Sequence, residues 1–275
     1  MRTVKTIIKE TKETQEIRSL VEVYEELAAA RMQKIRGGIL ASRDFFTGLS
    51  GLSADVGADL SLAGLGESGQ VAVFVSAETG LYGDIIDKIF VSFMDFVKKN
   101  KVDIVVIGKL GASLLKSLSP ATTFKYFDIS DNETDSTQLA VIMAELINYN
   151  KIFIFHGKFK NIVTQETWTT PISGQVLNKM QAQMLPREKF LYLYEPTEAA
   201  VAEVFTKEIA AAVFDQTLKE SQLAKFASRL MYLDTAIEKI DEKITGYKLE
   251  KAKAQKRAMG KKQAVAFSGI ISRKI

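Results

Sequence analysis

Cysteine is absent from this chain of 275 residues, and histidine and tryptophan each occur once. Without cysteine the chain can form no disulfide, no thiolate metal site and no cysteine nucleophile. No apolar run approaches the roughly 18 residues that a membrane-spanning helix needs, so we expect no transmembrane segment. The first residues, Met1–Lys5, enter a charged amphipathic pattern in place of a signal-peptide apolar region. This start favours a cytoplasmic or peripheral membrane location.

Catalytic signatures are also missing. The sequence contains no G-x-S-x-G, no H-E-x-x-H and no G-x-x-x-x-G-K-[ST], so the common hydrolase, zinc-protease and phosphate-loop sites are excluded. His156 has no companion motif, and we interpret it as a strand-end residue with a satisfied hydrogen bond in preference to a general base. Trp168 is interpreted as a packing residue. We therefore expect neither a catalytic residue nor a bound cofactor or metal.

The composition is that of an ordinary folded protein of one or two domains, with 47% hydrophobic residues. The net charge of +4 and the pI near 9.0 are mild, so acidic partners are permitted but not required.

A heptad pattern dominates the last third of the chain. Eight apolar residues recur at alternating spacings of three and four, which is typical of a helix in a left-handed coiled coil. No proline falls between Thr197 and Ile275, so one helix can run from about residue 210 to 267, roughly 85 Å. The eight residues are Leu223, Phe226, Leu230, Leu233, Ile237, Ile240, Ile244 and Tyr247.

The partner helix is predicted over residues 4–36. Its apolar residues also step by heptads, and Arg31 takes the place of one of them. We expect the two ends of the chain to pair as an antiparallel coiled coil, with a break at Gly37–Gly38 and a flexible connection over 47–70. The predicted seam residues are Ile17, Val21, Tyr24, Ala28 and Ile35.

The middle of the chain alternates strands and helices, which predicts an open, Rossmann-like α/β sheet with parallel strands and crossover helices. The predicted domains are therefore a shaft of residues 1–46 and 198–275, the connection 47–70, and an α/β domain over 71–197. Parallel strands are predicted at 71–76, 102–108, 124–129 and 151–155, helices at 82–100, 112–118 and 133–150, and antiparallel strands at 162–169 and 189–194.

Two features of this domain could be mistaken for ligand sites. Gly80 and Gly83 follow the first strand, where a Rossmann protein binds phosphate, but two glycines are too few for that fingerprint and we interpret them as a structural turn. Acidic residues gather between a strand and a helix without the spacing of a calcium loop, so we interpret them as helix-entry charges. They are Asp128, Asp131, Glu133 and Asp135.

Cations concentrate beyond Tyr247. Residues 248–262, called the basic segment below, hold seven cations in fifteen residues, opposed only by Glu250. Neighbouring cations repel, so an acidic protein surface around the helix explains the segment better than simple solvation, which remains the alternative. A phosphate backbone would serve electrostatically too, but no aromatic residues are interleaved to stack bases, so we expect no nucleic-acid partner. The cations are Lys248, Lys251, Lys253, Lys256, Arg257, Lys261 and Lys262.

An ordered set of short motifs resembles the gamma subunit of rotary ATP synthases along almost the whole chain. Thr14-Gln15 and Glu25–Met32 resemble the N-terminal helix of that family, and Ser76–Gly83 resembles its S-S-D-[RK]-G-L-C-G turn. The later matches are Ile107–Lys109, Lys158–Lys160 with Gln165, Met184–Pro186, Glu195–Thr197, Leu218–Ser221 and Ala227–Leu230.

The resemblance implies a noncatalytic rotor shaft inside a ring of alternating alpha- and beta-type subunits, which carry the nucleotide sites. It also implies contact with a small epsilon-like subunit and a membrane rotor ring, on the cytoplasmic side of the membrane. The residues expected to contact the ring of subunits are Arg31, Lys34, Arg229, Lys251, Lys253, Gln255, Lys256 and Arg257. Two other functions stay open: a static coiled-coil scaffold, and a small Rossmann-like enzyme that binds a nucleotide at Gly80 and Gly83.

Overall fold

The computed structural model of the chain describes residues 2–56, 65–66, 68–131, 136–182, 195 and 197–271. The chain divides into two compact units. The first consists of Met1–Leu27 and Tyr232–Ile275, and the second of Ala28–Met231. In the part of the chain that is described, none of the helices is both long enough and apolar enough to span a bilayer.

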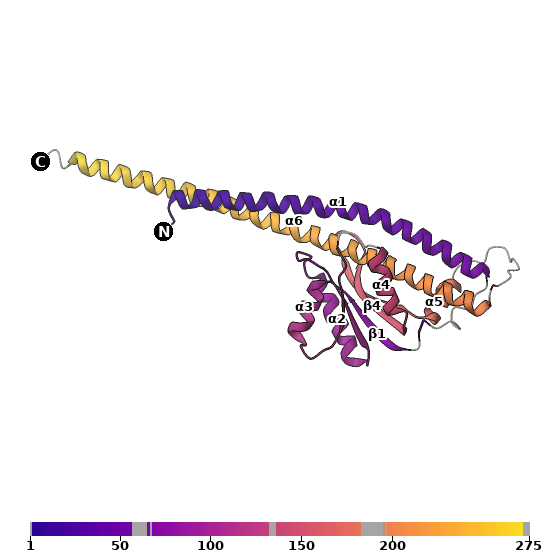
Figure 1. The fold of residues 1–275 in the computed structure, drawn as a ribbon. Coiled ribbons are helices and arrows are strands. Elements are labelled where there is room, and N and C mark those ends of the chain that lie inside the picture. Colours follow the sequence, from indigo (N-terminus) through magenta and orange to yellow (C-terminus); the bar gives the residue numbers. More distant parts are fainter. Residues whose placement is uncertain are drawn as a thin grey trace. The chain divides into compact units, whose positions relative to one another are not determined.

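The first unit is built from the beginning of α1 (Val4–Val56) and the end of α6 (Glu198–Ile271), which run side by side (Figure 1). The helices are antiparallel. Arg18 forms a salt bridge with Asp241, whereas Arg2, just before α1, forms one with Glu250, which lies farther along α6. The predicted heptads of α6 are confirmed here, since Leu233, Ile244 and Tyr247 are buried. A coiled coil of the two chain ends is therefore the correct architecture for this unit.

The predicted seam of α1 is partly wrong. Ile17 and Tyr24 are exposed, whereas Ile7 and Thr14 are buried. The inward face of α1 here also includes half-buried polar residues such as Arg18. The stripe of α1 that contacts α6 contains polar side chains. A search for apolar residues therefore selects the neighbouring stripe of Ile17 and Tyr24, which is more apolar but exposed.

The helix α1 is longer and more regular than expected. It continues without a break through Gly37–Gly38 and ends at Val56, so the first ten residues of the predicted connection 47–70 are helical. The other helix, α6, begins at Glu198 and also exceeds the expected 210–267. A long helix tolerates two glycines at a cost of about 1 kcal/mol each when packing along its length stabilises it.

A five-stranded sheet forms the centre of the second unit, in the order β3-β2-β1-β4-β5. The first four strands are parallel and β5 is antiparallel to β4, as the sequence predicts. The strands are β1 (Ser68–Val75), β2 (Asp103–Ile107), β3 (Lys125–Phe127), β4 (Tyr149–Phe159) and β5 (Gln165–Ile172). The strand predicted at 189–194 lies outside the described residues.

Helices cover both faces of this sheet (Figure 1). Alternate residues of β1 point to opposite faces, so Phe74 packs with α2 (Ile85–Lys99) and α3 (Lys109–Leu118), while Val73 packs with α4 (Ser136–Leu146) and with α6. A short helix, α5 (Gly174–Ala182), follows β5. The predicted helices over 82–100 and 112–118 correspond to α2 and α3, and the helix expected over 133–150 ends earlier, at Leu146, because β4 already begins at Tyr149.

A glycine after β2 is required by its backbone. Gly108 has φ of +94°, and a Cβ atom there would lie 2.8 Å from the carbonyl oxygen of Ala77. We expect Gly108→Ala to lower the free energy of unfolding by about 1–3 kcal/mol, because an L side chain is strained at this φ and the facing backbone cannot move cheaply. Urea unfolding followed by circular dichroism measures this. The control Gly69→Ala, where a Cβ meets nothing within 4 Å, should change stability little, and equal effects of the two substitutions would contradict the argument.

Candidate functional site

The end of α6 projects past the beginning of α1 as a single helix (Figure 1). Lys251 and Ala254 are half-buried, and all side chains described from Gln255 to Phe267 are exposed. Met259, Val265 and Phe267 are each about two-thirds exposed, at 67%, 71% and 68%. A helix with large apolar and cationic side chains on all sides buries little of its surface within its own chain, and is typical of a segment that packs against another protein.

Most of the predicted contact residues of the basic segment lie on this exposed helix. Lys253, Gln255, Lys256 and Arg257 are exposed and lie on α6, whereas Lys251, also on α6, is half-buried. Among the described residues no group of three potential metal ligands occurs, here or elsewhere.

A second exposed surface of the first unit was not predicted. Ile17, Leu20, Tyr24 and Leu27 are all roughly half exposed. Their spacings of three, four and three place them on one stripe of α1, beside the stripe of the buried Ile7 and Thr14. An apolar heptad stripe that the described part of the chain leaves half exposed is typical of an interaction surface.

The second unit contains a buried carboxylate, Asp131, with four hydrogen-bond donors around it. Its Oδ1 accepts a hydrogen bond of 2.8 Å from Lys225 Nζ on α6. Its Oδ2 accepts hydrogen bonds from the backbone N–H groups of Glu78 and Thr79 and from the Tyr82 hydroxyl, at 2.7, 3.2 and 3.0 Å. We call these groups the Asp131 cluster. Both charged side chains are almost fully buried, with 4% and 6% exposure.

The environment of Asp131 keeps it ionised. Burial alone would raise its pKa, but the Lys225 ammonium and the two backbone N–H groups outweigh burial and lower the pKa below its usual value. The neighbouring Tyr82 hydroxyl shows the opposite effect: burial and the Asp131 charge raise its pKa. Asp131 is therefore a structural anion, and its interpretation as a helix-entry charge is wrong. Asp128 lies 3.5 Å from Lys109 Nζ, and Glu133 and Asp135 lie outside the described residues.

The turn after β1 is bound to α6 by two further side chains. Ser228 Oγ donates to the carbonyl oxygen of Tyr82 at 2.6 Å, and the Arg229 guanidinium donates to the carbonyl oxygen of Gly80. The same guanidinium lies 4.1 Å from the centre of the Tyr82 ring. Of the predicted turn glycines, Gly83 has a positive φ of 60°, and Gly80 has no positive φ. The other predicted contact residues differ in exposure: Lys34 is exposed, and half-buried Arg31 lies 5.9 Å from the Phe226 ring.

This turn is not arranged as a phosphate site. In a Rossmann protein the N–H groups after the first strand face a phosphate. Here two of those N–H groups, of Glu78 and Thr79, already donate hydrogen bonds to the carboxylate of Asp131.

His156 fits no catalytic role either. Its Nδ1 lies 3.0 Å from the carbonyl oxygen of Gly157, and its Nε2 lies 2.9 Å from Thr170 Oγ1. Burial lowers its pKa to about 4, so the ring is neutral at pH 7. The predicted satisfied histidine is confirmed, although it lies inside β4 and not at a strand end. The packing role given to Trp168 is incomplete, because its ring is half exposed and lies under Lys158 Nζ at 4.0 Å.

Comparison with known proteins decides the family. The family model described as ATP synthase matches residues 1–260. The chain belongs to this ATP synthase family. Curated relatives agree: the ATP synthase gamma chain of Ruthia magnifica subsp. Calyptogena magnifica is 24% identical, over 97% of this chain and 96% of that protein. The ATP synthase gamma chain of Cytophaga hutchinsonii is 23% identical, over 95% and 94%.

Solved structures show the same fold at low sequence identity. A chain in the Euglena gracilis mitochondrial ATP synthase, in a structure of OSCP, F1 and c-ring, matches with a TM-score of 0.71 at 13% identity. The match covers 98% of this chain and 94% of that one. A chain of the central stalk and c-ring of the Tetrahymena thermophila enzyme matches with a TM-score of 0.58 at 16% identity, over 79% and 99%. The family fold therefore extends over both units of this chain.

Proposed function

We propose that this chain is the central rotor shaft of a rotary ATP synthase or of a rotary ATPase derived from one. Its rotation couples to ATP synthesis or hydrolysis at sites on surrounding alpha- and beta-type subunits, and the chain itself is noncatalytic. The observation that carries the proposal is the match of the ATP synthase family to residues 1–260, together with gamma-chain relatives that align over almost their whole length.

Two surfaces of the first unit support this role. The helix after Ala254 carries exposed cations, and α1 carries the apolar stripe of Ile17, Leu20, Tyr24 and Leu27. A shaft needs such surfaces, because a surrounding ring must contact it without binding one orientation permanently. Solvated cations facing acidic loops give contacts of this kind. We propose Lys253, Gln255, Lys256 and Arg257 as the principal ring contacts, with Lys251, Arg31 and Lys34 as further ones; Arg229 acts mainly inside the chain.

The remaining partners follow from the same proposal. A small epsilon-like subunit and a membrane rotor ring would bind the chain, and the complex would lie on the cytoplasmic side of the membrane as a peripheral assembly. A static scaffold is the alternative that the paired helices also allow. A nucleotide-binding enzyme is disfavoured, because the backbone N–H groups that would bind a phosphate already donate hydrogen bonds to Asp131.

The test is purification of the chain from its own cells under mild conditions. We expect two larger nucleotide-binding subunits to co-purify with it, with one copy of this chain per six of theirs, and we expect ATP to drive its rotation in single-particle assays. A chain that purifies alone would refute the proposal. A complex that hydrolyses ATP while this chain stays still would establish the static scaffold. Titration of the isolated chain with nucleotides should release no heat of binding.

A further inference from the structure

Polar contacts hold α6 to the turn after β1, close to the point where α6 leaves the second unit. Lys225 Nζ donates hydrogen bonds to the carbonyl oxygen of Ser76 and to Asp131 Oδ1, both at 2.8 Å. Ser228 and Arg229 follow on α6 and donate to backbone carbonyl oxygens of the same turn. The second unit ends two residues after Arg229. These contacts therefore lie on the last part of α6 that belongs to the unit of the α/β domain.

Apolar packing restrains the rotation of α6 about its own axis only weakly here. Residues 221–228 are all buried, but Leu223 and Phe226 are the only large apolar side chains among them. The contact with β4 joins small groups, since a Cβ atom at Gly157 would lie 3.1 Å from the Cβ atom of Ala224. Small groups allow a close approach without interlocking, and apolar attraction has no preferred direction.

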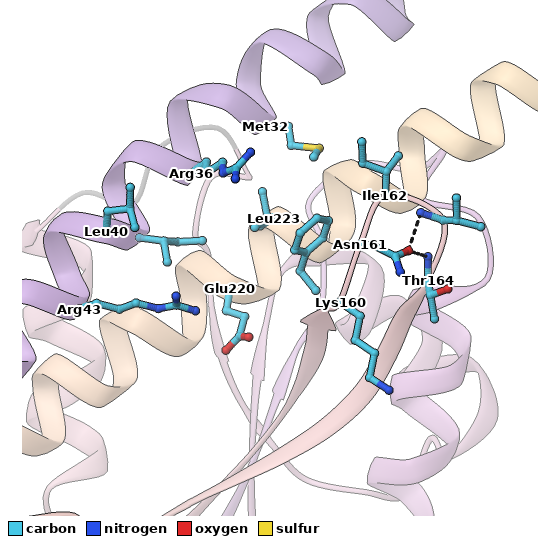
Figure 2. Close-up of a pocket in the computed structure, with 13 residues that line it drawn as sticks. Met32, Arg36, Leu40, Arg43, Lys160, Asn161, Ile162, Thr164, Glu220 and Leu223 are labelled. Carbon is cyan, nitrogen blue, oxygen red and sulfur yellow. Dashed lines mark hydrogen bonds between the residues drawn. The ribbon is translucent and has the colours of Figure 1, made fainter.

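Another flank of α6 borders a groove. It lies between α6, α1 and the hairpin that joins β4 to β5, and has a volume of about 880 Å³ (Figure 2). Glu220 and Leu223 line it from α6, and Arg36 lines it from α1. We call it the Arg36 groove. Dense packing is what fixes the position of an element in a protein interior, so this flank also resists rotation of α6 poorly.

Stability alone does not explain the buried ion pair of Lys225 and Asp131. Replacing both members of such a pair with apolar side chains is often neutral or stabilising. Nearby, the hydroxyls of Ser76 and Ser221 are buried and, among the described residues, have no hydrogen-bond partner. This region is therefore not arranged for maximum stability. Hydrogen bonds and ion pairs have preferred distances and angles, so these polar contacts define the rotational position of α6 relative to the turn.

We propose that Lys225 and Asp131 are positioning residues for rotary coupling, and that with Ser228 and Arg229 they form the joint through which torque passes between α6 and the α/β domain. The inference rests on the proposed shaft function. When the nucleotide-binding subunits turn the exposed end of α6 and a load resists at the α/β domain, the two parts are twisted against each other. The joint opposes this twist because its contacts are directional, whereas the apolar contacts beside it are not.

A double variant, Lys225→Met with Asp131→Asn, tests the joint. It removes the ion pair without leaving a charge buried, and the asparagine oxygen can still accept hydrogen bonds from the N–H groups of Glu78 and Thr79. The unfolding midpoint should therefore lie above that of Lys225→Met alone. In the complex, with the nucleotide-binding subunits fixed to a surface and arrested, a bead is coupled to p-azidophenylalanine at the exposed Lys116 of α3. The angular variance of the bead should increase about twofold in the double variant, because directional contacts are lost.

A milder variant keeps the test independent of folding. Ser228→Ala removes a single neutral hydrogen bond of the joint, of 2.6 Å, and should increase the variance by a smaller factor. Wild-type variance in both variants would refute the joint.

Two controls separate the joint from a general loosening of the chain. With the bead on the exposed Asp44 of α1, which bypasses the α/β domain, the double variant should show the wild-type variance. Glu78→Gln with Lys109→Met removes an ion pair of 2.8 Å that joins the same turn to α3 instead of α6, and should leave the variance at Lys116 unchanged. An increase in either control would overturn the proposal. The shaft function itself fails if the wild-type bead does not rotate with ATP, so the two failures are distinguishable.

Discussion

Lys225→Met is expected to lower the free energy of unfolding by about 3–5 kcal/mol, because it leaves the buried carboxylate of Asp131 without its cation. The ammonium of Lys225 also donates to the carbonyl oxygen of Ser76, so a second buried acceptor loses its partner. Chemical denaturation of the purified wild type and variant measures the loss, provided that the free energy of unfolding depends equally steeply on denaturant concentration in both proteins. A cost this large would place the Asp131 cluster among the principal contacts that hold α6 against the α/β domain.

The matched control is Lys219→Met. Lys219 also forms a salt bridge within the second unit, with Asp215 at 2.7 Å, but its side chain is 28% exposed and that of Asp215 21%. Partly solvated pairs contribute only about 0–1 kcal/mol. If both substitutions destabilise the chain equally, burial is not the cause of the effect and the argument for the Asp131 cluster fails.

The difference in stability between the wild type and Lys225→Met should also depend on pH, in a direction that the pKa of Asp131 determines. The folded-state pKa of Asp131 is lowered, so its contribution to stability is fully present above the pKa of an unfolded aspartate, about 3.9, and is lost as pH falls through the lower folded value. Without Lys225, burial raises that pKa instead. The stability difference between the wild type and Lys225→Met should therefore shrink as pH falls, first through the raised pKa of Asp131 in the variant and then below about 4 as Asp131 of the wild type is protonated. A difference that is constant from pH 7 to pH 3 would contradict this account.

Replacing Lys253, Lys256 and Arg257 together with glutamine should reduce ATP hydrolysis by the purified complex about two- to tenfold. The expected loss reflects weaker charge contacts between the exposed helix and acidic loops of the surrounding subunits. All three side chains are exposed, so the unfolding midpoint of the chain should not change. Steady-state ATPase assays and single-particle torque measurements provide the two readouts.

A second triple variant controls for net charge. Lys98, Lys101 and Lys116 are exposed cations of the α/β domain, and their replacement with glutamine should leave hydrolysis at the wild-type rate. Unchanged turnover in the Lys253, Lys256 and Arg257 variant would rule out an electrostatic contact between this helix and the ring. Loss of turnover in both variants would show that overall charge, and not its position, is what matters.

The eight heptad positions from Leu223 to Tyr247 could be predicted because each is apolar and each faces inward, so composition and geometry agree. The N-terminal helix shows where this agreement ends. Its inward face includes Thr14 and Arg18, while Ile17 and Tyr24 point outward. A periodicity search cannot choose between two stripes on one helix when the outer stripe is the more apolar, and only the position of α6 decides which stripe is buried.

Asp131 and Lys225 illustrate the same division for the candidate site. Ninety-odd positions separate them in the sequence, and nothing in the local pattern of either residue indicates the other. The Arg36 groove likewise joins α1, α6 and the β4–β5 hairpin, and no sequence window contains more than one of them. Such sites depend on which elements the sheet order brings together, so local reasoning could not find them.

The sequence by itself determined the two long helices, the parallel sheet with its antiparallel fifth strand, the absence of common catalytic motifs, and the basic segment after Tyr247. Each of these depends on periodicity, strand spacing or composition, which are local properties. The tertiary structure decided which face of α1 is buried, the role of Asp131 as a buried counter-charge, and the existence of the Arg36 groove. These depend on contacts between distant segments, whose free energies come from burial and charge pairing that exist only after the chain has folded.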